Sequence, residues 1–459
     1  MIQAIQLILA LSFLVLIHEL GHFTFARIFK VRVEKFYMFF NPWRSIFRMK
    51  KFEGKWHFKF FAKNKDEEWA KYPETTEWGI GWLPFGGYCA IGGMVDETHK
   101  SEDLAPEPQP WEFRSKPAWQ RMLIILGGIM VNFVGALIIY WMLLWQYGTD
   151  RLPLRNMTDG LYYSQMWLDE GFQQKDKILS VNGIQPRELG DLSKAIILNG
   201  KRDIEVQRGD SILYITLSPE FSDNCIRVLR GKDKSSVQLG GWLPCKVDTV
   251  IPNMPAALAG MQKGDSIVAV NGEPASCMIQ MNQALEGHAN DTVEVTYFRG
   301  EEQLTARMVL GDDAKLGIQV RDFVWDHKSY SFFRALPAGV KFGWRTLAEY
   351  VEGIGLVFTR SEVAKSVGGF GAIGSMFPST WSWPAFWYMT AFLSIILAFM
   401  NFLPIPALDG GYVLFLLWEM ITRRKPSDRF LEIANQIGFW LLMALLILAN
   451  GNDILRLFS

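Results

Sequence analysis

Four apolar stretches constrain the fold of this chain more than any other feature of its sequence. A helix that crosses the hydrocarbon core of a bilayer needs about 20 mostly apolar residues, and each stretch reaches that length. The first has no basic residue before its apolar run and no small-residue cleavage site after it, so we expect it to be retained. The expected spans lie within residues 1–28, 118–147, 383–421 and 433–452.

Basic residues near these spans predict the orientation of the chain, because Lys and Arg favour the cytoplasmic side of a membrane. Residues 27–60 contain ten Lys or Arg against two Asp or Glu, and basic clusters also precede the second and fourth spans. We therefore expect residues 29–117 and 422–432 to be cytoplasmic, and the N-terminus, residues 148–382 and the C-terminus to lie on the other side. Over all 459 residues, 47 basic side chains balance 47 acidic ones, so charge does not suggest a nucleic-acid partner.

An internal repeat divides the long segment between the second and third spans. The run "LDEGFQQKDKILSVNG" is matched later by "LAGMQKGDSIVAVNG", and each copy continues into strands around an Arg-Gly dipeptide. Asn-Gly turns between β-rich runs are typical of hairpins. Both copies, residues 148–235 and 236–325, resemble PDZ domains, which bind extended peptides at a sheet edge. A size filter without a bound peptide and a plain spacer are the alternatives.

Two further regions complete the expected fold. Residues 326–382 are expected to form amphipathic linker helices, on the membrane surface or between domains. In residues 29–117, "FRMKKFEGKWHFKFFAKN" and "WGIGWLPFGGYCAIGGM" indicate strands or hairpins against the membrane. The predicted fold class is a polytopic α-helical membrane protein with about four transmembrane helices, two tandem extracytoplasmic β-rich PDZ-like domains and cytoplasmic-side membrane-associated β-hairpins.

The four cysteines leave their pairing open. Cys89 falls on the expected cytoplasmic side, whereas Cys225, Cys245 and Cys277 fall in the expected extracytoplasmic part. An odd number there gives no complete pairing. A Cys225–Cys245 disulfide and three isolated thiols are both compatible with the sequence.

The first span contains the sequence "HELGH" in an otherwise apolar run. Positions i and i+4 share one face of a helix, so His18 and His22 can bind one Zn²⁺, with Glu19 as a general base that activates water. The five-residue pattern alone is only moderately specific. Ionisable residues inside a span are costly, however, and indicate function. The alternative is three polar groups that are simply satisfied between helices.

A catalytic zinc site requires a third protein ligand and one open position. The stretch "AFMNFLPIPALDGGYVLFLLW" contains one acidic residue in an apolar setting, Asp409. Pro404 and Pro406 predict irregular backbone before it, which is tolerated at membrane depth where it lines a cavity. The alternative role for Asp409 is to cap the helix that starts near Gly410.

The motifs and their order resemble a known family. "HELGH" in the first span, "LPFGGYCAI" after it, the tandem PDZ-like copies and "NFLPIPALDGG" after the third span are similar to the site-2 protease family of intramembrane zinc metalloproteases, in particular its bacterial RseP type. The resemblance covers nearly the whole chain. It implies the zinc ligands His18, His22 and Asp409, the base Glu19, and a role for Asn401 in binding the substrate backbone or stabilising the reaction. The alternative for Asn401 is a hydrogen bond between helix and loop.

The resemblance also implies regulated intramembrane proteolysis in a bacterial inner membrane. The substrate would be the transmembrane segment of a single-pass protein, either an anti-sigma factor or a signal-peptide remnant, after a first cleavage. The active site would face the cytoplasmic side and the PDZ-like domains the periplasm. The chain departs from the family pattern at "YMFFNPW" and "GGFGAIGSM"; neither change touches an expected ligand.

Two other functions are compatible with parts of the sequence. A membrane scaffold that presents PDZ domains would use zinc structurally, and a structural site would need a fourth protein ligand. A transporter would account for the broken helix at "NFLPIPALDGG", but no counterpart of it appears in the first half, as an inverted repeat requires. If the chain is a protease, an unwound substrate segment could add to the edge strand "WHFKFF" or "GYCAIGGM".

Overall fold

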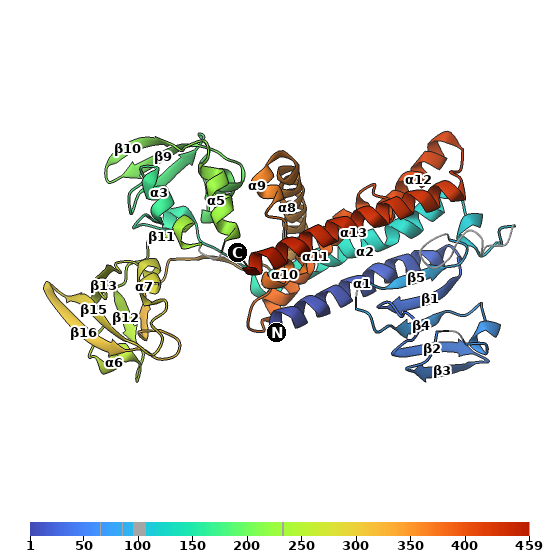
Figure 1. Ribbon diagram of the computed structural model, residues 1–459, viewed down its shortest axis with the longest axis horizontal. Helices are drawn as coiled ribbons and strands as arrows, with labels where there is room; N and C mark the ends of the chain where they lie inside the picture. Colours follow the sequence, from blue (N-terminus) through green and yellow to red (C-terminus); the bar gives the residue numbers. More distant parts are fainter. Residues whose placement is uncertain (65, 85, 95–106, 232–233, 459) are drawn as a thin grey trace. The chain divides into compact units, whose positions relative to one another are not determined.

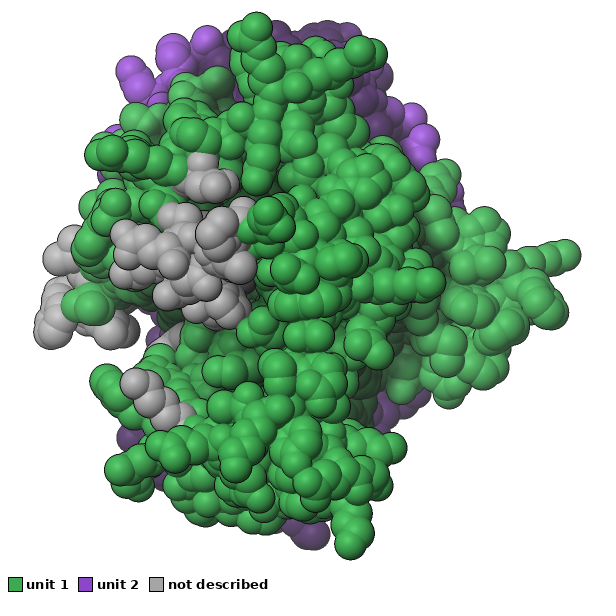
Figure 2. All heavy atoms as spheres, turned by 90° about the vertical axis from the view of Figure 1, so that its right-hand side faces the viewer, with its two compact units in different colours: residues 1–148, 329–458 green, residues 149–328, 459 purple. Residues whose placement is uncertain are grey.

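The computed structural model describes residues 1–64, 66–84, 86–94, 107–231 and 234–458. The chain divides into two compact units, which Figure 2 distinguishes by colour. Unit 1 comprises Met1–Gly148 and Ser329–Phe458, and unit 2 comprises Thr149–Lys328. Phe85 of the "LPFGGYCAI" motif and residues 95–106 of the expected cytoplasmic segment lie outside the described residues.

Four helices in the described part of the chain are long and apolar enough to cross a membrane, which confirms the expected number. Leu, Ala and Met favour helix formation, and a helix that is apolar all round is suited to lipid contact or deep burial. The helices are α1 (Ile2–Ile28), α2 (Ala118–Tyr147), α11 (Trp383–Phe402) and α13 (Asp428–Phe458).

Residues 383–421 form two helices, because the backbone is interrupted after α11. The second helix, α12, covers Asp409–Thr422. Pro404 and Pro406 lie between the two helices, and a proline removes a backbone donor and clashes with a preceding helical turn. The interruption places a short irregular segment, residues 403–408, directly before Asp409.

Helix α2 contacts most other helices of unit 1 (Figure 1). It packs against α1, α11 and α12, and also against α8 (Phe332–Thr359). The buried residues of α8 are Ala335, Gly339 and Gly343. A Cβ atom on Gly339 would lie 2.8 Å from the backbone nitrogen of Trp141, so the small residues allow α8 to approach α2 closely. Two short helices, α9 (Ser361–Ala364) and α10 (Phe370–Ser375), follow.

Unit 1 also contains a five-stranded sheet with the order β3-β2-β4-β1-β5. β2 and β3 form a hairpin, whereas β4 and β5 both pair with β1, on its opposite sides. The β1–β4 pair is parallel and the other pairs are antiparallel. Both strands expected as sheet edges, β3 and β5, are edges. The strands are β1 (Val33–Met38), β2 (Phe47–Phe52), β3 (Lys55–Phe60), β4 (Glu77–Ile80) and β5 (Tyr88–Ile91).

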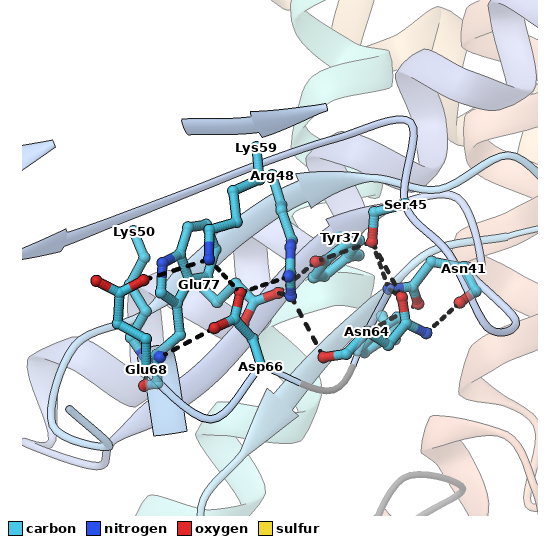
Figure 3. A network of polar contacts seen from close by, with 12 residues as sticks. Tyr37, Asn41, Ser45, Arg48, Lys50, Lys59, Asn64, Asp66, Glu68 and Glu77 are labelled. Atoms are coloured by element: carbon cyan, nitrogen blue, oxygen red, sulfur yellow. Dashed lines mark hydrogen bonds and ion pairs between the residues drawn. The ribbon is translucent and has the colours of Figure 1, made fainter. Parts of the chain in front are cut away.

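A buried polar network stabilises this sheet (Figure 3). The Tyr37 hydroxyl on β1 donates to Glu77 on β4 at 2.5 Å, and Arg48 on β2 pairs with Asp66 at 2.7 Å. Arg48 is only 1 % exposed, so its charge requires these partners. Burial, reinforced by the Glu77 carboxylate, raises the pKa of Tyr37 well above its usual range, which keeps the hydroxyl a donor.

The two copies of the sequence repeat form two β-rich halves of unit 2 with matching interactions. Arg208 donates to both carboxylate oxygens of Asp176 at 2.9 and 2.7 Å, and Arg299 donates to both of Asp265 at 2.8 Å. Each arginine also donates to a glycine carbonyl, at 2.8 Å to Gly171 in one copy and at 3.0 Å to Gly260 in the other. Paired bidentate contacts of this kind fix one turn against one strand.

The elements of unit 2 follow the repeat in sequence (Figure 1). The first half contains β6 (Thr149–Arg151), β7 (Leu161–Tyr163), α3 (Gln165–Asp169), β8 (Lys177–Val181), α4 (Leu189–Ser193), β9 (Asp203–Arg208), β10 (Ser211–Thr216) and α5 (Phe221–Arg230). The second half contains β12 (Val247–Val250), α6 (Pro255–Leu258), β13 (Ser266–Val270), β14 (Glu273–Pro274), α7 (Met278–Leu285), β15 (Thr292–Arg299), β16 (Glu302–Val309) and β17 (Ile318–Val320). Two later strands pair with the first half instead: β11 (Leu239–Gly241) with β7, and β18 (Asp326–Lys328) with β6.

All four cysteines are buried free thiols. The possible Cys225–Cys245 disulfide is not formed, and the alternative of isolated thiols describes the structure. Burial raises the pKa of Cys225 to about 12. The thiol is therefore protonated at neutral pH and behaves as a small core side chain.

Candidate metal centre

His18 and His22 lie one turn apart on α1 and point into the same space. They are 9 % and 7 % exposed, and their Nε2 atoms are 3.1 Å apart. Nδ1 of His22 lies 3.0 Å from the carbonyl oxygen of Ile124 on α2. A carbonyl can only accept, so this contact places the proton of a neutral ring on Nδ1 and leaves the Nε2 lone pair free for a metal.

Glycines of α2 make room for the two imidazole rings. A Cβ atom on Gly128 would lie 2.5 Å from Nε2 of His22 and 2.7 Å from Cε1 of His18. At the same crossing, a Cβ atom on Gly21 of α1 would lie 2.3 Å from the carbonyl oxygen of Gly127. The helices therefore approach closely because small residues face each other, and the space beside the rings exists because position 128 has no side chain.

Asp409 brings a carboxylate to the histidines from the other end of the sequence. Its Oδ2 atom lies 3.2 Å from Nε2 of His18 and 3.4 Å from Nε2 of His22. Asp409 is the first residue of α12, and Leu408 occupies the cap position. The carboxylate thus points at the two rings, and the capping role considered from the sequence is not the one that the structure shows.

The two glycines after Asp409 allow the preceding segment to fold back over the start of α12. A Cβ atom on Gly410 would lie 2.1 Å from the carbonyl oxygen of Leu403, and one on Gly411 would lie 2.6 Å from that of Ile405. Helix α13 also contacts residues 403–408, since Asn435 accepts a hydrogen bond from the Ala407 backbone N–H at 3.3 Å. The "LDGG" sequence is therefore a local requirement for aiming Asp409.

The three converging atoms fit a zinc ion. They are separated by 3.1, 3.2 and 3.4 Å, close to the spacing of about 3.3 Å that tetrahedral geometry with bonds of about 2.0–2.1 Å requires. Oδ2 of Asp409 is buried and, within the described part of the chain, has no hydrogen-bond donor. Lone pairs on three atoms so close together repel one another unless a cation lies between them.

Among the described residues, the cluster has three members, His18, His22 and Asp409. Two imidazoles and one carboxylate with a further position left open are typical of catalytic zinc sites. The structure therefore brings the three sequence-predicted ligands together. The arrangement can polarise a carbonyl or lower the pKa of water when zinc is bound.

The other two predicted site residues lie beside this cluster in sequence. Glu19 follows His18 on α1 and is half-buried, and Asn401 is half-buried in the last turn of α11, across residues 403–408 from Asp409. The edge strand β5 also begins close to the site. A Cβ atom on Gly87 would lie 2.9 Å from Cγ1 of Val15 on α1, nearly one turn before His18.

Sequence reasoning missed Asn132 and Gly128, both on α2. Asn132 is fully buried, and its side-chain amide lies 3.2 Å from Nδ1 of His18. A signal was present, because Asn132 is a polar residue within an apolar span, where polar groups are rare and indicate function. Gly128 stands in a Gly-Gly pair of the same span, which is typical of close helix contact.

Comparison with known proteins gives matches over the length of the chain. The model of "Peptidase family M50" matches residues 6–62 and 68–445. A Vibrio cholerae protein named "Putative zinc metalloprotease" is 27 % identical over 99 % of this chain and 98 % of its own. "Regulator of sigma-E protease RseP" of Escherichia coli is 26 % identical over 98 % of both chains. "Regulator of sigma E protease" of Haemophilus influenzae is 25 % identical over 98 % of both.

Proposed function

This chain belongs to peptidase family M50, the site-2 type of zinc metalloprotease, and on that premise we propose that it cleaves a peptide bond within the transmembrane segment of a single-pass membrane protein. The observation that carries the proposal is the convergence of His18, His22 and Asp409 on one point beside apolar helices. A site at that place is suited to a substrate that is itself a membrane helix.

We assign His18, His22 and Asp409 as the residues that hold the zinc. When bound there, zinc supplies Lewis-acid polarisation of the scissile carbonyl and of water. Neighbouring residues hold these ligands in the protonation form and orientation that metal binding requires. Ile124 fixes the proton of His22 on Nδ1, and the Gly410–Gly411 pair aims the Asp409 carboxylate.

Glu19 is the proposed general base. It follows the first ligand on α1, so its carboxylate is attached to the same rigid helix as the metal centre. The carboxylate takes a proton from the attacking water as the new C–O bond forms, and then gives this proton to the nitrogen as the C–N bond breaks. Water is consumed, and one carboxyl and one amino terminus are produced.

The substrate must unwind before it can be cut, because the carbonyls of a transmembrane helix are hydrogen-bonded within the helix. We propose that the unwound segment adds to the edge strand β5, which begins beside α1. β3 is the other edge strand, at the opposite end of the sheet from β5. Asn401, with its amide at the end of α11, is the proposed contact to the substrate backbone.

The choice between the two edges can be tested by photo-crosslinking. Benzoylphenylalanine, an aromatic replacement, is placed at Tyr88 in β5 or at Phe58 in β3, in protein that also carries Glu19→Gln to trap the substrate. Crosslinks to a transmembrane substrate from position 88 and none from position 58 are expected. Crosslinks from position 58 alone would assign the substrate to β3.

The proposed substrate is an anti-sigma factor or a signal-peptide remnant that has already lost its outer domain. Two relatives are named as regulators of sigma E, which favours the first. We propose that the chain lies in a bacterial inner membrane, with the metal centre toward the cytoplasmic side and the two halves of unit 2 in the periplasm as PDZ-like domains. Reporter fusions at residue 200 and at residue 425 test the orientation.

The PDZ-like halves are proposed to admit only substrates with short outer segments. The test compares one transmembrane segment with and without a folded outer domain. Cleavage of the short form alone is expected. Equal cleavage of both would exclude the size filter and leave peptide binding or spacing as the role of unit 2.

The central experiment measures both zinc and cleavage on the purified full-length protein. About one zinc per chain, and a product whose new terminus lies inside the transmembrane segment by mass spectrometry, are expected. Zinc without cleavage of any transmembrane substrate would favour the alternative, a scaffold with a structural metal. Within the described ranges the cluster has three members, which argues against that alternative because structural zinc is usually held by four protein ligands.

A further inference from the structure

The side chain of Asn132 on α2 lies within hydrogen-bonding distance of the ring of His18. Asn132 is 0 % exposed, and its amide nitrogen Nδ2 lies 3.2 Å from Nδ1 of His18. Its backbone carbonyl accepts a hydrogen bond from the Ser394 hydroxyl of α11 at 2.7 Å. The backbone of Asn132 thus contacts a third helix, while its side chain is directed at α1.

The chemistry of the ring decides which end of the amide must face it. If His18 binds zinc through Nε2, the neutral ring carries its proton on Nδ1. An N–H facing the amide NH₂ would place two donors against each other. The amide oxygen Oδ1 is buried without a hydrogen-bond partner among the described residues. The oxygen and nitrogen of an amide exchange places by a half-turn about the last side-chain bond.

We infer that Asn132 is a positioning residue, which turns its Oδ1 toward His18, accepts the hydrogen bond from Nδ1–H and so holds the ring in the form that binds zinc through Nε2. Outer hydrogen bonds of this kind fix the tautomer and the orientation of metal-binding histidines. The inference rests on the proposed role of His18 as a zinc ligand.

The second histidine provides an internal comparison. Nδ1 of His22 is held by the carbonyl of Ile124, at 3.0 Å. Ile124 and Asn132 lie two turns apart on α2, so one helix supplies the outer partner of each ring. A backbone carbonyl can only accept, whereas an amide side chain can be exchanged for groups that only accept or do neither. Position 132 is therefore the place where the role can be tested by substitution.

Three variants of the full-length protein separate the roles. Asn132→Asp keeps an acceptor and loses the donor, and Asn132→Leu keeps the approximate shape and loses both. Ser394→Ala removes only the bond to the Asn132 backbone. The readout is zinc affinity, measured by competition with a chromophoric chelator after metal removal in detergent. Loss of an outer-shell partner typically weakens metal binding about 10–100-fold.

We expect Asn132→Leu to weaken zinc binding by about 10–100-fold, while Asn132→Asp and Ser394→Ala stay close to wild type. Rescue by Asp is the signature that a merely structural role would not give. If Asp weakens binding as much as Leu, or if Leu binds zinc as wild type does, the inference is wrong. The variant His18→Ala tests the proposed ligand set separately from the role of Asn132. If His18→Ala binds zinc with wild-type affinity, the assignment of His18 as a ligand is wrong.

A second measurement covers the case in which Asn132→Leu does not fold. The chain has six histidines, so ¹⁵N-histidine labelling of the zinc-loaded wild type, with His18→Gln to assign its signals, reports the tautomer of His18. A protonated Nδ1 whose signal shifts in Asn132→Asp is expected. An Nδ1 that carries no proton would overturn the inference without any need for the Leu variant.

Discussion

Nε2 of His18 lies 3.2 Å from Oδ2 of Asp409, although the two residues stand near opposite ends of the sequence. One is on α1 and the other is the first residue of α12. All of unit 2 lies between them in the chain. The metal centre therefore depends on the packing of unit 1, and it can be probed at the ligands, at the helix contact and at the segment before α12.

Removing the proposed base separates chemistry from metal binding. Glu19→Gln keeps the size of the side chain and removes its basicity, so we expect cleavage to fall by at least about 100-fold with zinc content unchanged. Cleavage is followed on a transmembrane substrate, and zinc by elemental analysis of the same sample. Substantial proteolysis by this variant would show that another group moves the proton.

Removing the carboxylate ligand should affect zinc itself. Asp409→Ala leaves two histidines, and two ligands hold zinc much more weakly than three, so we expect both zinc content and cleavage to be lost. A chelator should inactivate the wild type, with recovery on adding zinc. Glu349→Gln, at an exposed carboxylate of α8, is the matched control and should retain both. Full zinc content in Asp409→Ala would refute the ligand assignment.

A single methyl group on α2 should disturb the two rings. In Gly128→Ala the new Cβ would lie 2.5 Å from Nε2 of His22, so the rings must move, and we expect zinc affinity to fall about 10–100-fold. Gly135→Ala on the same helix is the control, because its Cβ would meet only the end of the Ile17 side chain at 3.3 Å. Equal zinc affinity in the two variants would contradict the role given to Gly128.

Helix α13 should influence the metal centre through Asn435. This side chain accepts from the Ala407 N–H and donates to the Tyr412 hydroxyl at 2.7 Å. Asn435→Ala removes both bonds, so we expect a loss of about 1–2 kcal/mol in the free energy of unfolding and weaker zinc binding. Asn452→Ala, which removes bonds from the same helix to the carbonyls of Lys365 and Val367, should destabilise without changing zinc affinity.

The Asp265–Arg299 pair should make unit 2 sensitive to acid. Hydrogen bonds from Arg299, together with one from the Gln262 N–H, hold the pKa of Asp265 below its usual range. Because the pKa is lowered in the folded state, this stabilisation is complete above the usual value of about 4 and is lost as the pH falls through the folded-state value.

Asp265→Asn tests this dependence directly. We expect it to lower the free energy of unfolding by about 1.5–3 kcal/mol at pH 7, and the difference from wild type to shrink below about pH 4. Thermal or chemical unfolding of the full-length protein, followed over a pH series, measures the difference. A difference that is constant down to pH 3 would show that the carboxylate charge is not what stabilises this turn.

Much of the fold could be predicted because its signals are local. Apolar stretches of about 20 residues predicted the helices that could cross a membrane, and Pro404 and Pro406 predicted the break before Asp409. The HELGH spacing placed two imidazoles on one helix face. Strand pairing was harder, since β4 and β5 flank β1 instead of pairing with each other, and residue patterns do not encode which distant strand lies alongside.

The residue pattern alone establishes which chemical groups are available: two histidines at helical spacing, one acidic residue after a broken helix, and apolar surroundings in which charged groups indicate function. How these groups come together depends on the packing of the helices. The contact of Gly21 with Gly127, the space beside Gly128 and the amide of Asn132 all depend on α1 and α2 crossing at one place. Close packing between helices is a property of two surfaces together, and neither helix specifies it alone.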